Sequence, residues 1–174
     1  MDQADADDAI LANVLSELEA FDLAPVEQDS QAHGAWCMPG FTGKSRVATS
    51  FGDLPIEALR LRDTLRTISG SFLPVKFLDK VHLENEFLSQ VPEAKPVWVR
   101  ANALGKGMPN KDLMISRHQR VNLSHTPQNA KTIEQLLSRL ALPAAAQDTV
   151  TYYLFHCGEP AMVQVDGIWC LTEP

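Results

Sequence analysis

The sequence predicts one mainly β domain; one observation indicates the β class and a second indicates a single domain. After Lys44, the apolar residues fall into short runs of β-type residues that turn residues interrupt. The length of 174 residues, with 45% apolar content, is enough for one domain with a sizeable core. We therefore expect one globular domain over residues 40–174, preceded by an N-terminal helix and linker over residues 1–39.

The apolar runs place the strands, and the turn residues separate them. A hairpin-like turn is predicted at Phe51–Asp53, and Pro55 favours a single helical turn up to Leu59. A longer helix is predicted over Asn129–Leu140, because four apolar residues share one face and Pro143 stops it. The predicted strands are Arg46–Ser50, Thr64–Ile68, Pro74–Leu83, Val97–Ala101, Asp112–Ser116, Arg120–Leu123, Thr149–Cys157 and Met162–Val165.

Residues 5–22 have the clearest helical periodicity in the chain. Apolar residues recur there every three or four positions, and Asp7 and Asp8 suit the positive N-terminal end of a helix. Such an apolar stripe needs a surface to pack on, in this domain or in a protein partner. The residues that we expect to bind a partner are Ile10, Leu11, Val14, Leu15 and Leu18.

The charge of −7 is unevenly distributed along the chain. The first 43 residues contain nine acidic residues and no Lys or Arg, so the remainder has 15 basic and 13 acidic residues. Nucleic-acid binding needs clustered Lys and Arg on a surface that an acidic segment would not repel. We therefore expect no nucleic-acid partner, although an acidic segment of this kind is most often simply solvated.

The sequence also bears on membranes and compartment. It contains no apolar run long enough to cross a bilayer and no signal-peptide pattern, so we expect no membrane partner and a cytoplasmic location. Cys37, Cys157 and Cys170 are odd in number and irregularly spaced, which fits a reducing compartment. Export by a route without an N-terminal signal stays open.

Three blocks of the sequence, taken together, resemble one known domain. Residues 40–49 read GFTGKSRVAT, and IEALRLRD follows at 56–63; residues 96–123 read PVWVRANALGKGMPNKDLMISRHQRVNL; VTYY at 150–153 precedes VQVDGIW at 163–169. Over residues 40–171 the chain resembles the Hint (hedgehog/intein) domain, and the second block resembles its bacterial branch. The resemblance implies a horseshoe of short curved strands with one inserted helix. It also implies an origin in a domain that rearranges its own peptide bond.

The same comparison shows where the chain departs from the family. The family's nucleophilic Cys corresponds to Gly40, and the Gly of its first turn corresponds to Arg62. The family's T/S-x-x-H motif corresponds to residues 116–119, so Ser116 keeps the hydroxyl and Gln119 replaces the imidazole. A His-Glu pair that the bacterial branch often carries corresponds to residues 160–161, which are Pro and Ala.

In the family, a thiolate attacks the preceding carbonyl while a His and a hydroxyl assist. Gly40 has no atom to attack with, and the amide of Gln119 cannot exchange a proton near neutral pH. Cys37 could replace the nucleophile only through a register shift or a looped linker, because on a strand it would lie roughly 10 Å away and face the opposite side. Thr42 and Ser45 are weaker nucleophiles with no identified base.

His118 has two interpretations. It points away as a surface or edge histidine, or it takes the catalytic imidazole position if the break after the strand is one residue shorter than in the family. Nearby Arg117 and Arg120 would depress its pKa by like-charge repulsion. A metal site at His156, Cys157 and Cys170 is disfavoured, because paired ligands at short spacing are absent and adjacent strand residues face opposite sides. We expect neither metal nor cofactor.

Taken together, these residues predict a Hint-like domain without its autoprocessing activity, serving as a structural or protein-interaction module. The alternative is a self-cleaving domain with a non-standard nucleophile, assisted by Ser116 and His118.

Overall fold

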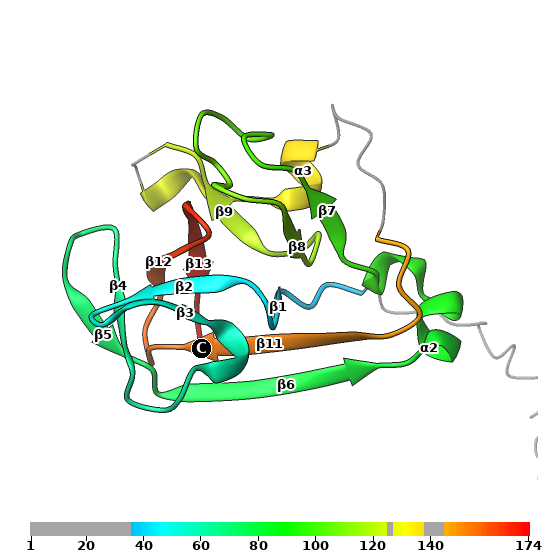
Figure 1. Cartoon of the computed structure of the whole chain (residues 1–174), viewed down its shortest axis with the longest axis horizontal. Coiled ribbons are helices and arrows are strands. Elements are labelled where there is room, and N and C mark those ends of the chain that lie inside the picture. The colour runs from blue at the N-terminus through cyan, green and yellow to red at the C-terminus, as the bar shows by residue number, and fades with distance from the viewer. Residues whose placement is uncertain (1–35, 125–126, 138–144) are drawn as a thin grey trace, which may run out of the picture. The chain divides into compact units, whose positions relative to one another are not determined.

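β-Strands dominate the part of the chain that the structure, a computed structural model, describes: residues 36–124, 127–137 and 145–174 (Figure 1). The mainly β fold predicted from the sequence is therefore confirmed. The helix predicted over residues 5–22, with the residues expected to bind a partner, lies outside the described residues. None of the described helices is long and apolar enough to cross a membrane.

A five-stranded antiparallel sheet carries the segment that contains Gly40. Its strand order is β6-β11-β1-β8-β7, so the short β1 lies between two strands that come much later in the chain. Phe41 of β1 pairs with Tyr153 on one side and with Ile115 on the other. The strands are β1 (Phe41–Thr42), β6 (Phe77–Leu83), β7 (Val97–Val99), β8 (Leu113–Ile115) and β11 (Val150–His156).

An eight-stranded antiparallel sheet forms the rest of the β structure. Its order is β10-β9-β13-β12-β2-β4-β5, with β3 pairing on β2 outside this path. The strands are β2 (Arg46–Thr49), β3 (Gly52–Pro55), β4 (Thr64–Arg66), β5 (Phe72–Pro74), β9 (Arg120–Asn122), β10 (Lys131–Thr132), β12 (Ala161–Val165) and β13 (Ile168–Thr172).

The single strand predicted over Pro74–Leu83 is wrong, because the chain changes sheets within it. Pro74 ends β5, which pairs with β4, whereas β6 begins at Phe77 and pairs with β11. Between them, the amide of Val75 donates to the Asp63 carbonyl and the amide of Lys76 donates to the His156 carbonyl. A continuous run of β-type residues therefore spans two sheets.

The inserted helix begins four residues later than predicted. Lys131–Thr132 pairs with β9, and α3 (Ile133–Leu137) follows; residues 138–144 lie outside the described residues. Thr132 and Gln135 form a capping box, in which the Gln135 amide donates to Thr132 Oγ1 at 3.2 Å and the Thr132 amide donates to Gln135 Oε1 at 3.1 Å. The other described helices are α2 (Asn85–Gln90), for which no prediction was made, and the 3₁₀ turns η1 (Ile56–Ala58), η2 (Pro92–Ala94) and η3 (Pro127–Asn129).

The first turns largely follow the sequence. The predicted helical turn after Pro55 is confirmed as η1, with Pro55 as its N-cap. The β2–β3 hairpin is also present, although its turn lies at residues 50–51 because Thr49 already pairs with Gly52. Arg62 has a φ of +75°, a left-handed conformation that glycine adopts without strain. This is the position where the family has its turn Gly.

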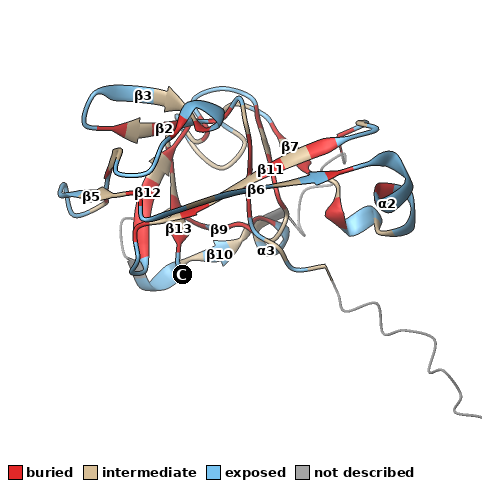
Figure 2. Cartoon of the chain, turned by 90° about the horizontal axis from the view of Figure 1, so that it is seen from below, coloured by how far each residue is buried: buried red, intermediate tan, exposed pale blue. Residues whose placement is uncertain are grey.

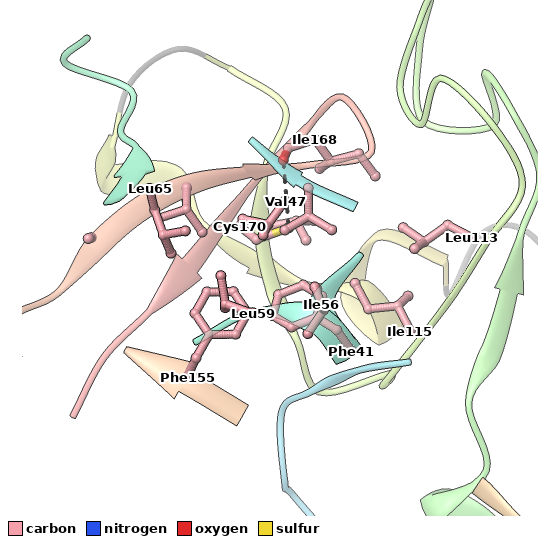
Figure 3. Close-up of a cluster of buried hydrophobic side chains, with 14 of the residues drawn as sticks. Phe41, Val47, Ile56, Leu59, Leu65, Leu113, Ile115, Phe155, Ile168 and Cys170 are labelled. Carbon is pink, nitrogen blue, oxygen red and sulfur yellow. Dashed lines mark hydrogen bonds between the residues drawn. The ribbon is translucent and has the colours of Figure 1, made fainter. Parts of the chain in front are cut away.

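The main core lies where the two sheets meet. Figure 3 shows Phe41 and Phe155 of the five-stranded sheet packed near Val47 and Cys170 of the other. The rings of Phe41 and Phe155 stack, with centroids 5.4 Å apart. In Figure 2, buried residues concentrate on β12 and β13, whereas the ribbon around α2 is largely exposed. A second, smaller cluster surrounds Tyr152, and Trp36 and Met38 pack against it.

Candidate functional site

Four of the residues singled out in the sequence line one pocket of about 400 Å³: Cys37, Gly40, His118 and Gln119. The pocket lies beside the start of β1, with walls from β6, β9, β11 and β13. Its lining is Cys37, Pro39, Gly40, Phe41, Phe77, His118, Gln119, Arg120, Tyr153, Leu154, Phe155, His156, Leu171, Thr172, Glu173 and Pro174.

Gly40, which the resemblance aligns with the family's nucleophile, is buried and lies immediately before β1. Its carbonyl accepts a hydrogen bond from the amide of Ser116 at 3.1 Å, and its φ is +156°. A Cβ atom added at this position would lie 3.2 Å from both Cβ and Cδ1 of Tyr152. This contact is tighter than ordinary packing, so a side chain at position 40 requires Tyr152 to shift by a few tenths of an ångström.

Tyr152 itself is held in place. It is fully buried, and its hydroxyl donates to the carbonyl of Ala94 at 2.8 Å. Burial raises the pKa of this phenol well above its usual range, so the hydroxyl stays protonated. Sequence reasoning did not identify Tyr152 as part of the site, because only the folded chain brings β11 under Gly40.

Ser116 follows β8 and is 1% exposed. Its Oγ donates to the carbonyl of Met38 at 2.7 Å and accepts a hydrogen bond from the amide of His118 at 3.2 Å. The hydroxyl therefore ties the end of β8 to the segment that precedes Gly40. Ser116 does not line the pocket, and both hydrogen bonds of its hydroxyl are to backbone groups.

Gln119 is 2% exposed, and its side chain joins two strands. Nε2 donates to the carbonyl of Leu171 in β13 at 2.8 Å and to the carbonyl of Arg120 at 3.1 Å. Both amide hydrogens are thus used for backbone bonds. Gln119, which the resemblance aligns with the family's imidazole, therefore joins two strands through its side chain.

His118 lies in the turn between β8 and β9, and 18% of its side chain is exposed. Its Nδ1 is 4.0 Å from Glu134 Oε2, while its Nε2 is buried and has no hydrogen-bond partner among the described residues. Burial lowers the pKa of His118, and Arg117 adds to this effect, while Glu134 opposes it. The repulsion expected from the arginines is thus a smaller cause than burial. The site residue that sequence reasoning missed here is Glu134, which α3 brings to the turn.

Cys37 is exposed in the irregular segment before β1, yet it lines the same pocket as Gly40. The expected separation to opposite faces assumed a strand through this segment. Because β1 begins only at Phe41, that alternation does not apply.

The other two cysteines, Cys157 and Cys170, are free and buried. Burial raises the pKa of both Cys157 and Cys170, so their thiols stay protonated at neutral pH. Within the described ranges, no group of three or more His, Cys, Asp or Glu side chains is placed to hold a metal ion.

The arrangement combines an apolar pocket, a neutral histidine and two polar side chains that bind backbone carbonyls. The family model of the Hint domain matches residues 39–172. This range covers the strands from β1 to β13, including the described residues of the site except Cys37, Met38 and the last residues of the pocket wall. A search of curated proteins gave no match. Since the family model covers most of its length, the chain belongs to the Hint domain family.

Proposed function

We propose that this Hint domain has lost the family's self-cleavage and serves as a structural or protein-interaction module. The observation that carries the proposal is Gly40, which puts a bare backbone where the thiolate would stand. The close approach of Tyr152 supports it, because a new side chain there would meet the ring at 3.2 Å. Without a nucleophile the covalent route itself is missing.

The neighbouring polar residues support the same conclusion. Gln119 commits both amide hydrogens to carbonyls of β9 and β13, and Ser116 commits its hydroxyl to Met38. Each interaction stabilises the folded backbone, and neither leaves a group to transfer a proton. We propose that a set of catalytic positions has become a set of structural ones, in a member of the family's bacterial branch. A phylogeny that groups residues 96–123 with eukaryotic members would contradict this placement.

We propose that the partner of such a module is a protein and that the helix predicted over residues 5–22 binds it. The basis is the apolar stripe of Leu11, Leu15 and Leu18 with its acidic surroundings. Replacing these three leucines with Asp should abolish co-purification of a partner while the circular dichroism of the β domain is retained. Co-purification that survives the substitutions would contradict this role of the helix.

A second candidate function is self-cleavage through Cys37. One observation favours it: the exposed Cys37 and His118 line the same pocket. In this mechanism the Cys37 thiolate would attack the carbonyl of Trp36, converting that amide into a thioester. His118 would protonate the released amine.

Intact-mass measurement of the freshly purified chain tests the two functions. Loss of autoprocessing predicts a stable species of 19.2 kDa that is unchanged by added thiol. Fragments that arise at Cys37 and disappear in Cys37→Ala, but persist in the matched variant Cys157→Ala, would overturn the proposal. Fragments that arise at Gly40 would overturn it as well.

A further inference from the structure

The pocket beside Gly40 has the properties of a ligand site. Its volume of about 400 Å³ falls within the usual range for small-molecule pockets, roughly 300–1,000 Å³. An apolar cavity of about 150 Å³ is enough to hold one benzene ring. The pocket therefore has room for a molecule of two fused rings.

The charged side chains of the pocket wall are paired with each other. Arg120 and Glu173 form an ion pair with each other at 3.6 Å, with about half of each side chain exposed. The Gln119 amide binds two carbonyls, and Thr172 Oγ1 donates to the Ala161 carbonyl at 3.4 Å. His118 is neutral at pH 7, because burial lowers its pKa. Among the described residues of the wall, a charged ligand would find no unpaired charged side chain, and it would lose its hydration.

The apolar walls are largely aromatic. Phe77 stacks on the imidazole of His156, with centroids 4.9 Å apart and the rings 8° from parallel. Tyr153 and Phe155 also border the pocket from β11, but the Phe155 ring stacks on Phe41 in the main core. Phe77 is 43% exposed although it is a large apolar side chain, so a bound ring could cover surface that water now contacts.

We propose that this pocket binds a small uncharged aromatic molecule of one or two rings. The contacts would be dispersion and ring packing against Phe77 and His156, and the binding is non-covalent. The inference goes beyond the proposed function, since it holds whether or not the chain cleaves itself.

The test is a titration of the full chain with indole, followed by ¹H–¹⁵N NMR. Indole should give saturable shifts at residues of β6, β11 and β13, with a Kd in the millimolar range or tighter, as expected for nine heavy atoms. Phe77→Ala should raise this Kd about two- to tenfold, because it removes one ring contact. The matched control is Phe72→Ala, since Phe72 is 49% exposed on β5 and lies outside the pocket. It should leave the Kd unchanged.

Related probes decide the chemical class. Indole-3-acetate and tryptamine, which add a negative and a positive charge, should each bind at least about tenfold more weakly than indole. Absence of saturable shifts with indole, or equal effects of Phe77→Ala and Phe72→Ala, would overturn the proposal. Tighter binding of either charged probe would overturn the uncharged class. Tighter binding of the capped peptide acetyl-Gly-Trp-Gly-amide than of indole would overturn the small molecule in favour of a protein side chain.

Discussion

Replacing Tyr152 with Phe removes a single oxygen atom from under the site. The Tyr152 hydroxyl donates to the Ala94 carbonyl at 2.8 Å, and both residues are 0% exposed. A neutral hydrogen bond contributes about 1 kcal/mol net, and a buried carbonyl left without a donor costs about 1–3 kcal/mol. We therefore expect Tyr152→Phe to lower the free energy of unfolding by about 1–3 kcal/mol.

The assay is urea unfolding at neutral pH, followed by circular dichroism. With a slope of about 2 kcal/mol per molar urea, the midpoint should fall by roughly 0.5–1.5 M. Tyr153→Phe is the matched control, because it is the same substitution one residue later. Tyr153 is half-buried, and its hydroxyl makes no hydrogen bond within the described part of the chain. Equal midpoints for the two variants would refute the reasoning.

Three further predictions concern neighbouring positions. Gly40→Cys should lower the free energy of unfolding by about 1–3 kcal/mol, because the new side chain contacts Tyr152. The variant should also stay uncleaved, so fragments in its mass spectrum would contradict the prediction. Because burial lowers the folded-state pKa of His118 from 6.5, the unfolded state binds its proton more readily, and the urea midpoint should fall as pH drops below about 6.5. His118→Gln should reduce that fall, and an unchanged pH profile would contradict the assignment. Ser116→Ala should lower the free energy of unfolding by about 1–3 kcal/mol, because the Met38 carbonyl loses its donor. Ser45→Ala should leave it unchanged or raise it, because the Ser45 hydroxyl is buried without a hydrogen-bond partner among the described residues. The urea midpoint of each variant, compared with that of the unsubstituted chain, checks both.

The turn before β4 allows a test of backbone strain at Arg62. Arg62 keeps a left-handed φ of +75° although it is not glycine. Arg62→Gly should relieve about 1 kcal/mol of backbone strain, partly offset by the greater freedom of glycine in the unfolded state. Arg60→Gly, two residues earlier, serves as the control and should only destabilise. Thermal unfolding that ranks Arg60→Gly above Arg62→Gly would contradict this account of the turn.

Most strands could be predicted from local pattern, because β-type runs between turn residues do not depend on distant partners. Two of the failures occur where a pairing partner outside the segment decides. Pro74 and Phe77 belong to one β-type run, yet they pair with β4 and β11 in different sheets. The helix prediction began too early at Asn129, because Lys131–Thr132 has a second strand to pair with. Periodicity within one segment contains no information about such partners.

The sequence by itself determined the mainly β class, the family resemblance and the presence of a glycine at position 40, since each depends only on which residue stands at a position. The tertiary structure decided the use of the remaining polar groups. Gln119 clamps two strands because the carbonyls of Arg120 and Leu171 lie within reach of its Nε2, and the latter is 52 residues away in the chain. Likewise, only the fold places Tyr152 against Gly40, and only the fold shows that Cys37 and Gly40 line one pocket. Hydrogen bonding and packing act over a few ångströms in space, so distance along the chain does not predict them.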